Sequence, residues 1–162
     1  MNDTVLTRRA WMARVTIATI GGAALTMLRP TTSEASGVPI AITVYKDPSC
    51  GCCTKWVAHL RANGFAPQPH DRSDMDALKD SLGVPPAVRS CHTAMVGSYV
   101  IEGHVPAADI ARLVATKPAK TLGLAVPGMP AGSPGMEMGD RAERFDVVAF
   151  DARGGVRVFN RH

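Results

Sequence analysis

Three of the four cysteines in this chain lie within four consecutive residues, Cys50-Gly51-Cys52-Cys53, and the fourth is Cys91. The preceding stretch, residues 38–45, is β-branched and alternating, which predicts a strand. In residues 54–64, apolar side chains recur at helical spacing and Asn-Gly provides a stop. The thiols are therefore expected at a strand-to-helix turn. There, free N–H groups and the positive end of the helix dipole favour the thiolate, which is both a nucleophile and a metal ligand.

Two chemistries fit this motif. Cys50 and Cys53 have the C-x-x-C spacing of thiol–disulfide oxidoreductases. A redox pair needs only two thiols, however, and Cys52 inside the motif would invite wrong pairing. Four thiolates form a soft donor set that selects Cu(I), zinc or an iron–sulfur cluster. The neighbouring side chains of Cys52 and Cys53 diverge, which favours a polynuclear cluster with bridging thiolates over the paired knuckles of structural zinc sites.

Other residues are weaker candidates for metal ligation. His104 lies just ahead of an expected helix, where it is either a ligand or a helix-end hydrogen-bonding group. Met129 and Met136 lie in a Gly/Pro-rich segment rather than at the spacing of a helix core, and thioethers suit Cu(I). His92, beside Cys91, either binds metal or hydrogen-bonds the loop. A structural disulfide or zinc domain, in which the thiols serve stability alone, remains a third alternative.

The first 35 residues have the composition of an export signal. Arg8-Arg9 precedes a short apolar run at residues 15–28, a pattern typical of a twin-arginine signal, and this run is too short to span a bilayer. We therefore expect a cleaved signal over 1–35, a periplasmic location in a bacterium, one domain over 36–162 and no membrane span in the mature form. Four arginines and two acids belong to the signal, which reduces the net charge from +4 to +2. Without a Lys/Arg cluster, nucleic-acid binding is not expected.

The remaining segments predict the order β-α-β-α-β-β-α, a small α/β sandwich in which helices cover a short mixed sheet. After the first strand and helix, the expected elements are an edge strand at 65–70, a helix at 74–82, strands at 87–94 and 95–101 with a bulge or turn at 97–98, and a helix from 105 to about 115. Residues 123–140 contain eight Gly or Pro among 18 and predict a loop without helix or sheet. Residues 145–159 predict a C-terminal β-hairpin. In a thioredoxin-like topology, the loop after the second helix would bring Cys91 to the first helix N-terminus.

Four separated motifs carry a family resemblance. They are residues 45–53 with Trp56 and His59-Leu60, Ser90-Cys91-His92-Thr93-Ala94, Glu102-Gly103-His104-Val105-Pro106, and residues 123–137. Together they resemble the exported CopG-type metal-binding proteins of bacterial copper-resistance operons.

The resemblance implies a thioredoxin-like fold and a periplasmic copper site whose ligands are Cys50, Cys52, Cys53 and Cys91. The leading hypothesis is a protein that sequesters Cu(I), with or without Cu(I)/Cu(II) interconversion, and exchanges copper with other periplasmic copper-handling proteins or an exporter. If the protein is an enzyme, we expect a copper or thiol–disulfide oxidoreductase, the latter using Cys50 and Cys53.

Overall fold

The computed structural model describes residues 37–137, 139 and 143–162. The expected export signal at 1–35 lies outside the described residues, so it remains a prediction. Within the described part of the chain, no helix has the length and apolar character needed to cross a membrane.

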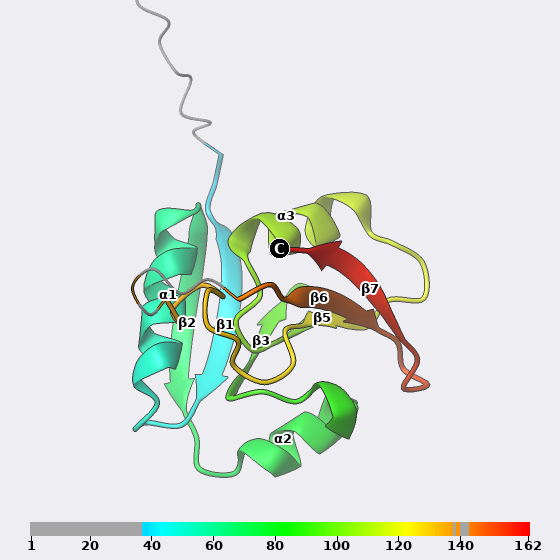
Figure 1. Ribbon diagram of the computed structural model, residues 1–162, viewed down its shortest axis with the longest axis horizontal. Helices are drawn as coiled ribbons and strands as arrows, with labels where there is room; N and C mark the ends of the chain where they lie inside the picture. Colours follow the sequence, from blue (N-terminus) through cyan, green and yellow to red (C-terminus); the bar gives the residue numbers. More distant parts are fainter. Residues whose placement is uncertain (1–36, 138, 140–142) are drawn as a thin grey trace, which may run out of the picture. The chain divides into compact units, whose positions relative to one another are not determined.

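The helices and strands follow the expected order, and a mixed α/β fold is confirmed (Figure 1). In chain order they are β1 (Ile40–Lys46), α1 (Gly51–Ala62), β2 (Phe65–Asp71), α2 (Met75–Ser81), a 3₁₀ turn η1 (Pro86–Val88), β3 (His92–Val96), β4 (Tyr99–Glu102), α3 (Ala107–Thr116), β5 (Gly123–Ala125), β6 (Asp146–Phe150) and β7 (Val156–Arg161). The more specific thioredoxin-like assignment remains a prediction.

The strands form one sheet in the order β2-β1-β3-β4-β5-β6-β7. β1 pairs with β2 and β4 with β5 in parallel, and the other neighbours are antiparallel. Strand β2 is at one edge, where Pro67 and Pro69 cost least because an edge strand leaves some N–H groups without a ladder partner. The connection from β1 to parallel β2 runs through α1, so the cysteine motif lies at the start of this crossover.

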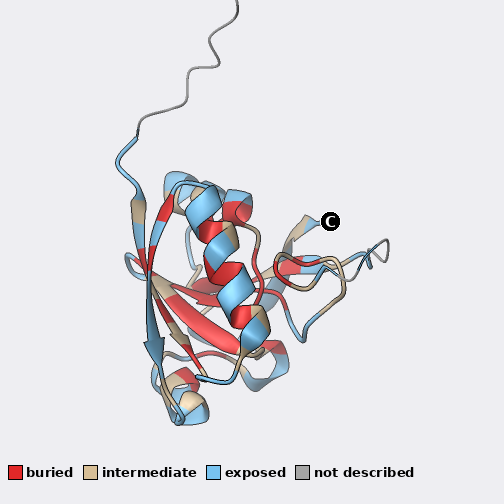
Figure 2. Ribbon diagram, turned by 90° about the vertical axis from the view of Figure 1, so that its left-hand side faces the viewer, coloured by how far each residue is buried: buried red, intermediate tan, exposed pale blue. Residues whose placement is uncertain are grey.

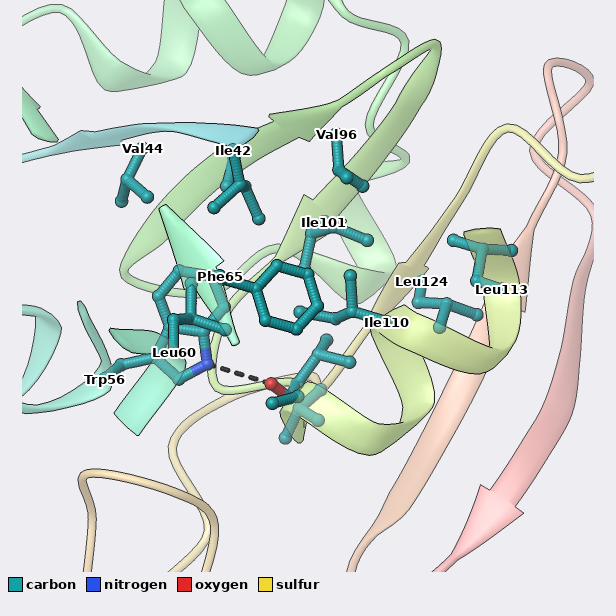
Figure 3. Close-up of a cluster of buried hydrophobic side chains, with 14 of the residues drawn as sticks. Ile42, Val44, Trp56, Leu60, Phe65, Val96, Ile101, Ile110, Leu113 and Leu124 are labelled. Atoms are coloured by element: carbon teal, nitrogen blue, oxygen red, sulfur yellow. Dashed lines mark hydrogen bonds between the residues drawn. The ribbon is translucent and has the colours of Figure 1, made fainter. Parts of the chain in front are cut away.

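Alternating residues of the central strands pack on opposite faces of the sheet. Ile101 and Leu124 face a core formed with α1 and α3, whereas Val100 and Phe150 face a smaller core under the segment that follows α2. Figure 3 shows the larger core, in which Trp56 and Leu60 of α1 lie beside Phe65 and Ile110. Figure 2 shows the buried positions of α1 as a stripe along the helix, which fixes how the cysteine end is oriented.

Three expectations for individual elements were wrong. The segment 87–94 is not one strand: residues 86–88 form η1 and β3 starts at His92. The stretch 95–101 is not one strand either: the turn expected as one alternative at Gly97-Ser98 joins β3 to β4, so 95–101 contains the end of β3 and most of β4. The stretch 123–140 is not free of sheet, because Gly123–Ala125 forms β5 between β4 and β6. The composition predicted a loop there, but β4 and β6 lie on either side and form backbone hydrogen bonds with this segment.

Core packing around β4 should dominate the free energy of unfolding. Ile101 is fully buried, and Ile101→Ala should cost about 2–5 kcal/mol because it leaves a cavity between α1, α3 and the sheet. Val156→Ala is the control: this side chain is 47% exposed in edge strand β7 and should cost less than about 1 kcal/mol. Urea unfolding of both variants measures the difference, and equal losses would contradict the packing described here.

Candidate metal centre

A tight turn joins β1 to α1 and places the cysteine motif. Asp47 Oδ1 accepts the Ser49 backbone N–H at 2.8 Å, and the Cys50 N–H donates to the Asp47 carbonyl at 3.1 Å. Helix α1 then begins at Gly51, so Cys52 and Cys53 lie in its first turn, at the strand-to-helix turn that the sequence predicted. Cys53 points into the core with no exposed surface, whereas Cys50 and Cys52 are half-buried.

The β3–β4 hairpin supplies the opposite side of the site. Thr93 and Glu102 are register partners, and the Gly103 N–H donates to the His92 carbonyl at 2.9 Å. Residues 91–92, where β3 starts, therefore lie beside residues 103–104, just after β4. Cys91 Sγ is 3.2 Å from His92 Nδ1 and 3.1 Å from His104 Nε2.

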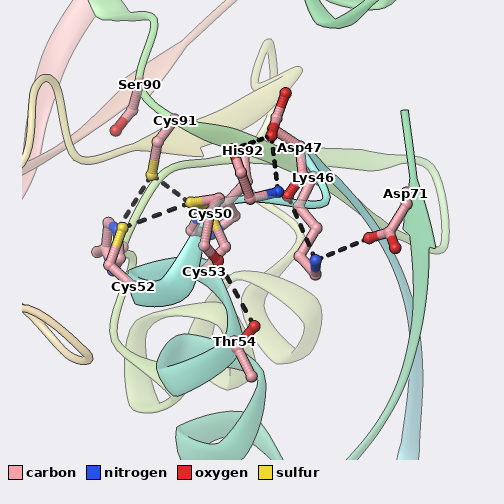
Figure 4. Close-up of a disulfide and its surroundings, with 12 residues drawn as sticks. Lys46, Asp47, Cys50, Cys52, Cys53, Thr54, Asp71, Ser90, Cys91 and His92 are labelled. Atoms are coloured by element: carbon pink, nitrogen blue, oxygen red, sulfur yellow. Dashed lines mark hydrogen bonds and ion pairs between the residues drawn. A yellow bond between two sulfur atoms is a disulfide. The ribbon is translucent and has the colours of Figure 1, made fainter. Parts of the chain in front are cut away.

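The two sides converge on Cys91 (Figure 4). The sulfur atoms of Cys50, Cys52, Cys53 and Cys91 all lie within 4.8 Å of one another, and one ligand atom each from Cys91, His92 and His104 meets the same limit. Cys91 thus belongs to a group of four sulfurs and also to a group of one sulfur and two imidazoles. In this structure Cys50 and Cys53 form a disulfide, whereas Cys52 and Cys91 are free thiols.

Trp56 joins the two sides of the site. Its ring lies 4.3 Å from the His92 ring, centre to centre, and its Nε1–H donates to the Val105 carbonyl at 2.9 Å. His92 is fully buried, and its Nε2 has no hydrogen-bond partner among the described residues. A buried polar atom without a hydrogen-bond partner is costly. The Nε2 atom of His92 is therefore a good candidate for binding a ligand that is not part of the protein chain.

Both imidazoles are held in the neutral form that binds metals. Burial lowers the pKa of His104 and lowers that of His92 well below its usual range. His104 Nδ1 lies 2.8 Å from the Pro134 carbonyl, which can only accept, so Nδ1 carries the proton. The lone pair of His104 Nε2 therefore faces Cys91 Sγ, an arrangement in which a backbone carbonyl orients a ligand imidazole.

The thiol of Cys91 is expected to be protonated in the absence of metal. Burial, with the nearby Cys52 sulfur, raises its pKa to about 12. A cation among these sulfurs would favour the thiolate and displace that proton. The site is therefore suited to exchanging protons for a metal ion.

A buried ion pair that the sequence analysis did not identify supports the Cys91 segment. Lys79 Nζ donates to Glu102 Oε1 at 2.5 Å and to Thr93 Oγ1 at 2.9 Å. The same Glu102 oxygen accepts the Ser90 backbone N–H at 2.7 Å, directly before Cys91. Burial raises the pKa of Glu102, and the Lys79 ammonium opposes that rise. One signal was available: Lys79 lies four residues after Met75, on the apolar stripe of its helix.

The loop after β5 lies against this site. Ser90 Oγ donates to the Gly128 carbonyl, and Pro134 holds His104 as described above. Gly135 packs directly on α1, because a Cβ there would lie 2.8 Å from the Trp56 backbone nitrogen. The loop therefore contacts both sides of the sulfur cluster.

The two candidate methionine ligands lie on the loop that contacts the site. Met129 is 53% exposed on the loop, next to the Gly128 contact with Ser90. Met136 is half-buried, and its N–H donates to the Ser133 carbonyl at 2.8 Å. Their roles as ligands remain predictions. His59 Nε2, on α1, accepts the Ala107 N–H at 3.1 Å at the start of α3.

Similarity to known proteins agrees with this geometry. A family model described as a protein of unknown function, DUF411, matches residues 88–136. Two solved structures, titled copper resistance protein copG Form 2 and Form 1, are 48% and 49% identical to this chain, each with a TM-score of 0.73. Each alignment covers 76% of this chain and 98% of the other. The chain belongs to the CopG family of copper resistance proteins. Among curated proteins, none matches it.

Membership of the CopG family confirms the resemblance that the motifs indicated. The DUF411 match spans Cys91, His92 and His104 together with most of the loop. The structural alignments also extend over most of the described residues. The sulfur cluster thus lies in a chain whose relatives are named for copper resistance.

The contact between Gly135 and α1 predicts how the loop shields the site. Gly135→Ala should displace the loop, because the new Cβ would meet the α1 backbone at 2.8 Å. Gly128→Ala is the matched control, with a positive φ of 68° compared with 86° but open space around the Cβ. Both substitutions cost about 1–2 kcal/mol for the left-handed backbone. Only the first should increase the rate at which Cys52 and Cys91 react with a maleimide, by several-fold; equal rates in the two variants would refute a covering loop.

Proposed function

We propose that this protein binds copper as Cu(I) in the bacterial periplasm and serves copper resistance. The observation that carries the proposal is the convergence of four cysteine sulfurs within 4.8 Å, with two buried imidazoles sharing Cys91. Cysteine sulfur is a soft ligand that selects Cu(I), and neutral imidazole also binds copper.

The donor arrangement favours more than one copper ion. Cys91 belongs to both groups of ligand atoms, so its thiolate is suited to bridging two ions. Cys53 is buried and Cys52 is half-exposed beside Cys50, yet the sulfurs of Cys52 and Cys53 lie within 4.8 Å of each other. A multinuclear cluster with bridging thiolates can use both sulfurs, with His104 and His92 as terminal ligands. Met129 and Met136 are proposed as additional soft ligands from the loop.

Copper binding at this site should release protons. With the pKa of Cys91 raised to about 12, its thiol is protonated at neutral pH in the metal-free protein, and each bound ion must displace protons from such thiols. The apparent affinity for copper should consequently rise with pH. The imidazoles impose little competition near neutrality, because their pKa values are lowered.

The wider context of the proposal comes from the N-terminus and the relatives. The composition of residues 1–35 supports export, and the similar solved structures carry the name of copper resistance proteins. We accordingly propose copper ions as the ligand and other periplasmic copper-handling proteins, or an exporter, as exchange partners.

A thiol–disulfide oxidoreductase is the second candidate, favoured by one observation. Cys50 and Cys53 form a disulfide at the N-terminus of α1, with Cys50 half-exposed and Cys53 buried. This asymmetry suits an exchange reaction in which only one sulfur is attacked. Such an enzyme would have no need for His92 and His104 beside Cys91, which is why copper binding is preferred.

Anaerobic Cu(I) titration of the reduced full chain tests the proposed function. More than one copper per chain should be retained against a chromophoric chelator, with thiolate-to-copper charge-transfer absorption. Cys52→Ser should lose a large part of that copper because a bridging sulfur is removed. Thr54→Ser, at an exposed position two residues further along the same helix, is the control and should bind like the wild type.

Two results would count against copper binding. One is the absence of retained copper under conditions that load a known copper chaperone. The other is equal retention in Cys52→Ser and wild type, together with insulin reduction that disappears in Cys50→Ser. The second pattern would establish the oxidoreductase instead.

A further inference from the structure

The disulfide divides the possible metal ligands into two sets. A disulfide sulfur carries no charge and is a poor ligand, so the bond between Cys50 and Cys53 removes two of the four thiolates. Cys52 and Cys91 remain free thiols in the same structure. The donors still available with the bond in place are therefore these two sulfurs and the imidazoles of His92 and His104.

The remaining set is already assembled in the disulfide form. Cys91 Sγ lies 3.1 Å from His104 Nε2 and 3.2 Å from His92 Nδ1, and the Cys52 sulfur is within 4.8 Å of the Cys91 sulfur. His104 is oriented by Pro134, and His92 is held between Cys91 and Trp56. None of these contacts involves Cys50 or Cys53.

We propose that the Cys50–Cys53 pair is a two-electron switch on copper capacity. As thiolates, the two residues complete a multinuclear copper site; as a disulfide, they leave a smaller site of Cys91, His92 and His104, with Cys52, that holds a single ion. The switch rests on the proposed copper function. Its partner is a protein with a dithiol or disulfide that exchanges with this bond.

The exchange chemistry follows from the exposure of the two sulfurs. A thiolate of the partner dithiol attacks the half-exposed Cys50 Sγ, which breaks the S–S bond and releases Cys53 as a thiolate. The second partner thiolate then attacks the mixed disulfide, so the partner is oxidised to a disulfide. Cys50 and Cys53 together gain the two electrons and two protons that the partner loses. The reverse reaction, with an oxidised partner, releases copper with no change in its oxidation state.

The two forms of the wild-type full chain provide the first test. The disulfide form is identified by two free thiols and the reduced form by four, with the disulfide mapped to Cys50 and Cys53. Both forms are loaded anaerobically with Cu(I) and challenged with the same chelator. The reduced form should retain at least about twofold more copper per chain, because four thiolates replace two.

Variants separate the two sites. His104→Ala should remove the ion from the disulfide form while the reduced form keeps most of its copper. Cys50→Ser, at a half-exposed position with little risk to folding, should lower retention by reduced protein to near that of the wild-type disulfide form. Circular dichroism of each variant verifies the fold.

Three results of these experiments would overturn part or all of the proposal. Equal retention by the reduced and disulfide forms would overturn the switch while leaving the copper function intact. A disulfide form that holds no copper would overturn the smaller site. Absence of binding in both forms would overturn the switch and the proposed function together.

Discussion

The contact between the N-terminal half of α1 and the start of β3 determines whether the ligands of the metal site come together. Trp56 lies on His92 and donates to the Val105 carbonyl, so one side chain attaches the cysteine helix to the start of β3 and to the segment between β4 and α3. This packing brings together ligand atoms that are far apart in the sequence, namely those of the motif Cys50–Cys53, of Cys91 and of His104. Because Trp56 is fully buried in the main core, the geometry of the site depends on the same packing that stabilises the sheet.

Polar groups buried behind the site hold the Cys91 segment in place. Lys79 and Glu102 satisfy each other, and Glu102 also accepts the Ser90 N–H. A buried ion pair of this kind contributes little net stability, but the loss of one partner leaves an uncompensated charge. The ion pair instead holds Ser90, the residue before Cys91, in place. It makes no hydrogen bond to the cysteine or to the imidazoles of the site. The thiol and imidazole groups of the site thus remain available to exchange protons, electrons and metal ions.

Local sequence signals predicted the order of elements, whereas the convergence of Cys91 with the cysteine motif was predicted from an expected thioredoxin-like topology and from the family resemblance. Strand alternation, the Asn63-Gly64 stop and the proline-marked edge strand were sufficient for most boundaries. They failed where tertiary hydrogen bonds decide, as in β5, which begins a Gly/Pro-rich segment but forms a strand because β4 and β6 flank it. The buried Lys79–Glu102 pair and the buried, unsatisfied Nε2 of His92 depend on three-dimensional neighbours, so composition alone could not identify them.

The most direct test of the central claim is X-ray absorption at the copper edge of the full chain loaded under reducing conditions. We expect a first coordination shell dominated by sulfur, with an imidazole contribution that decreases in His104→Ala. A shell of nitrogen and oxygen alone would contradict a copper site built on the four cysteine sulfurs that meet at Cys91.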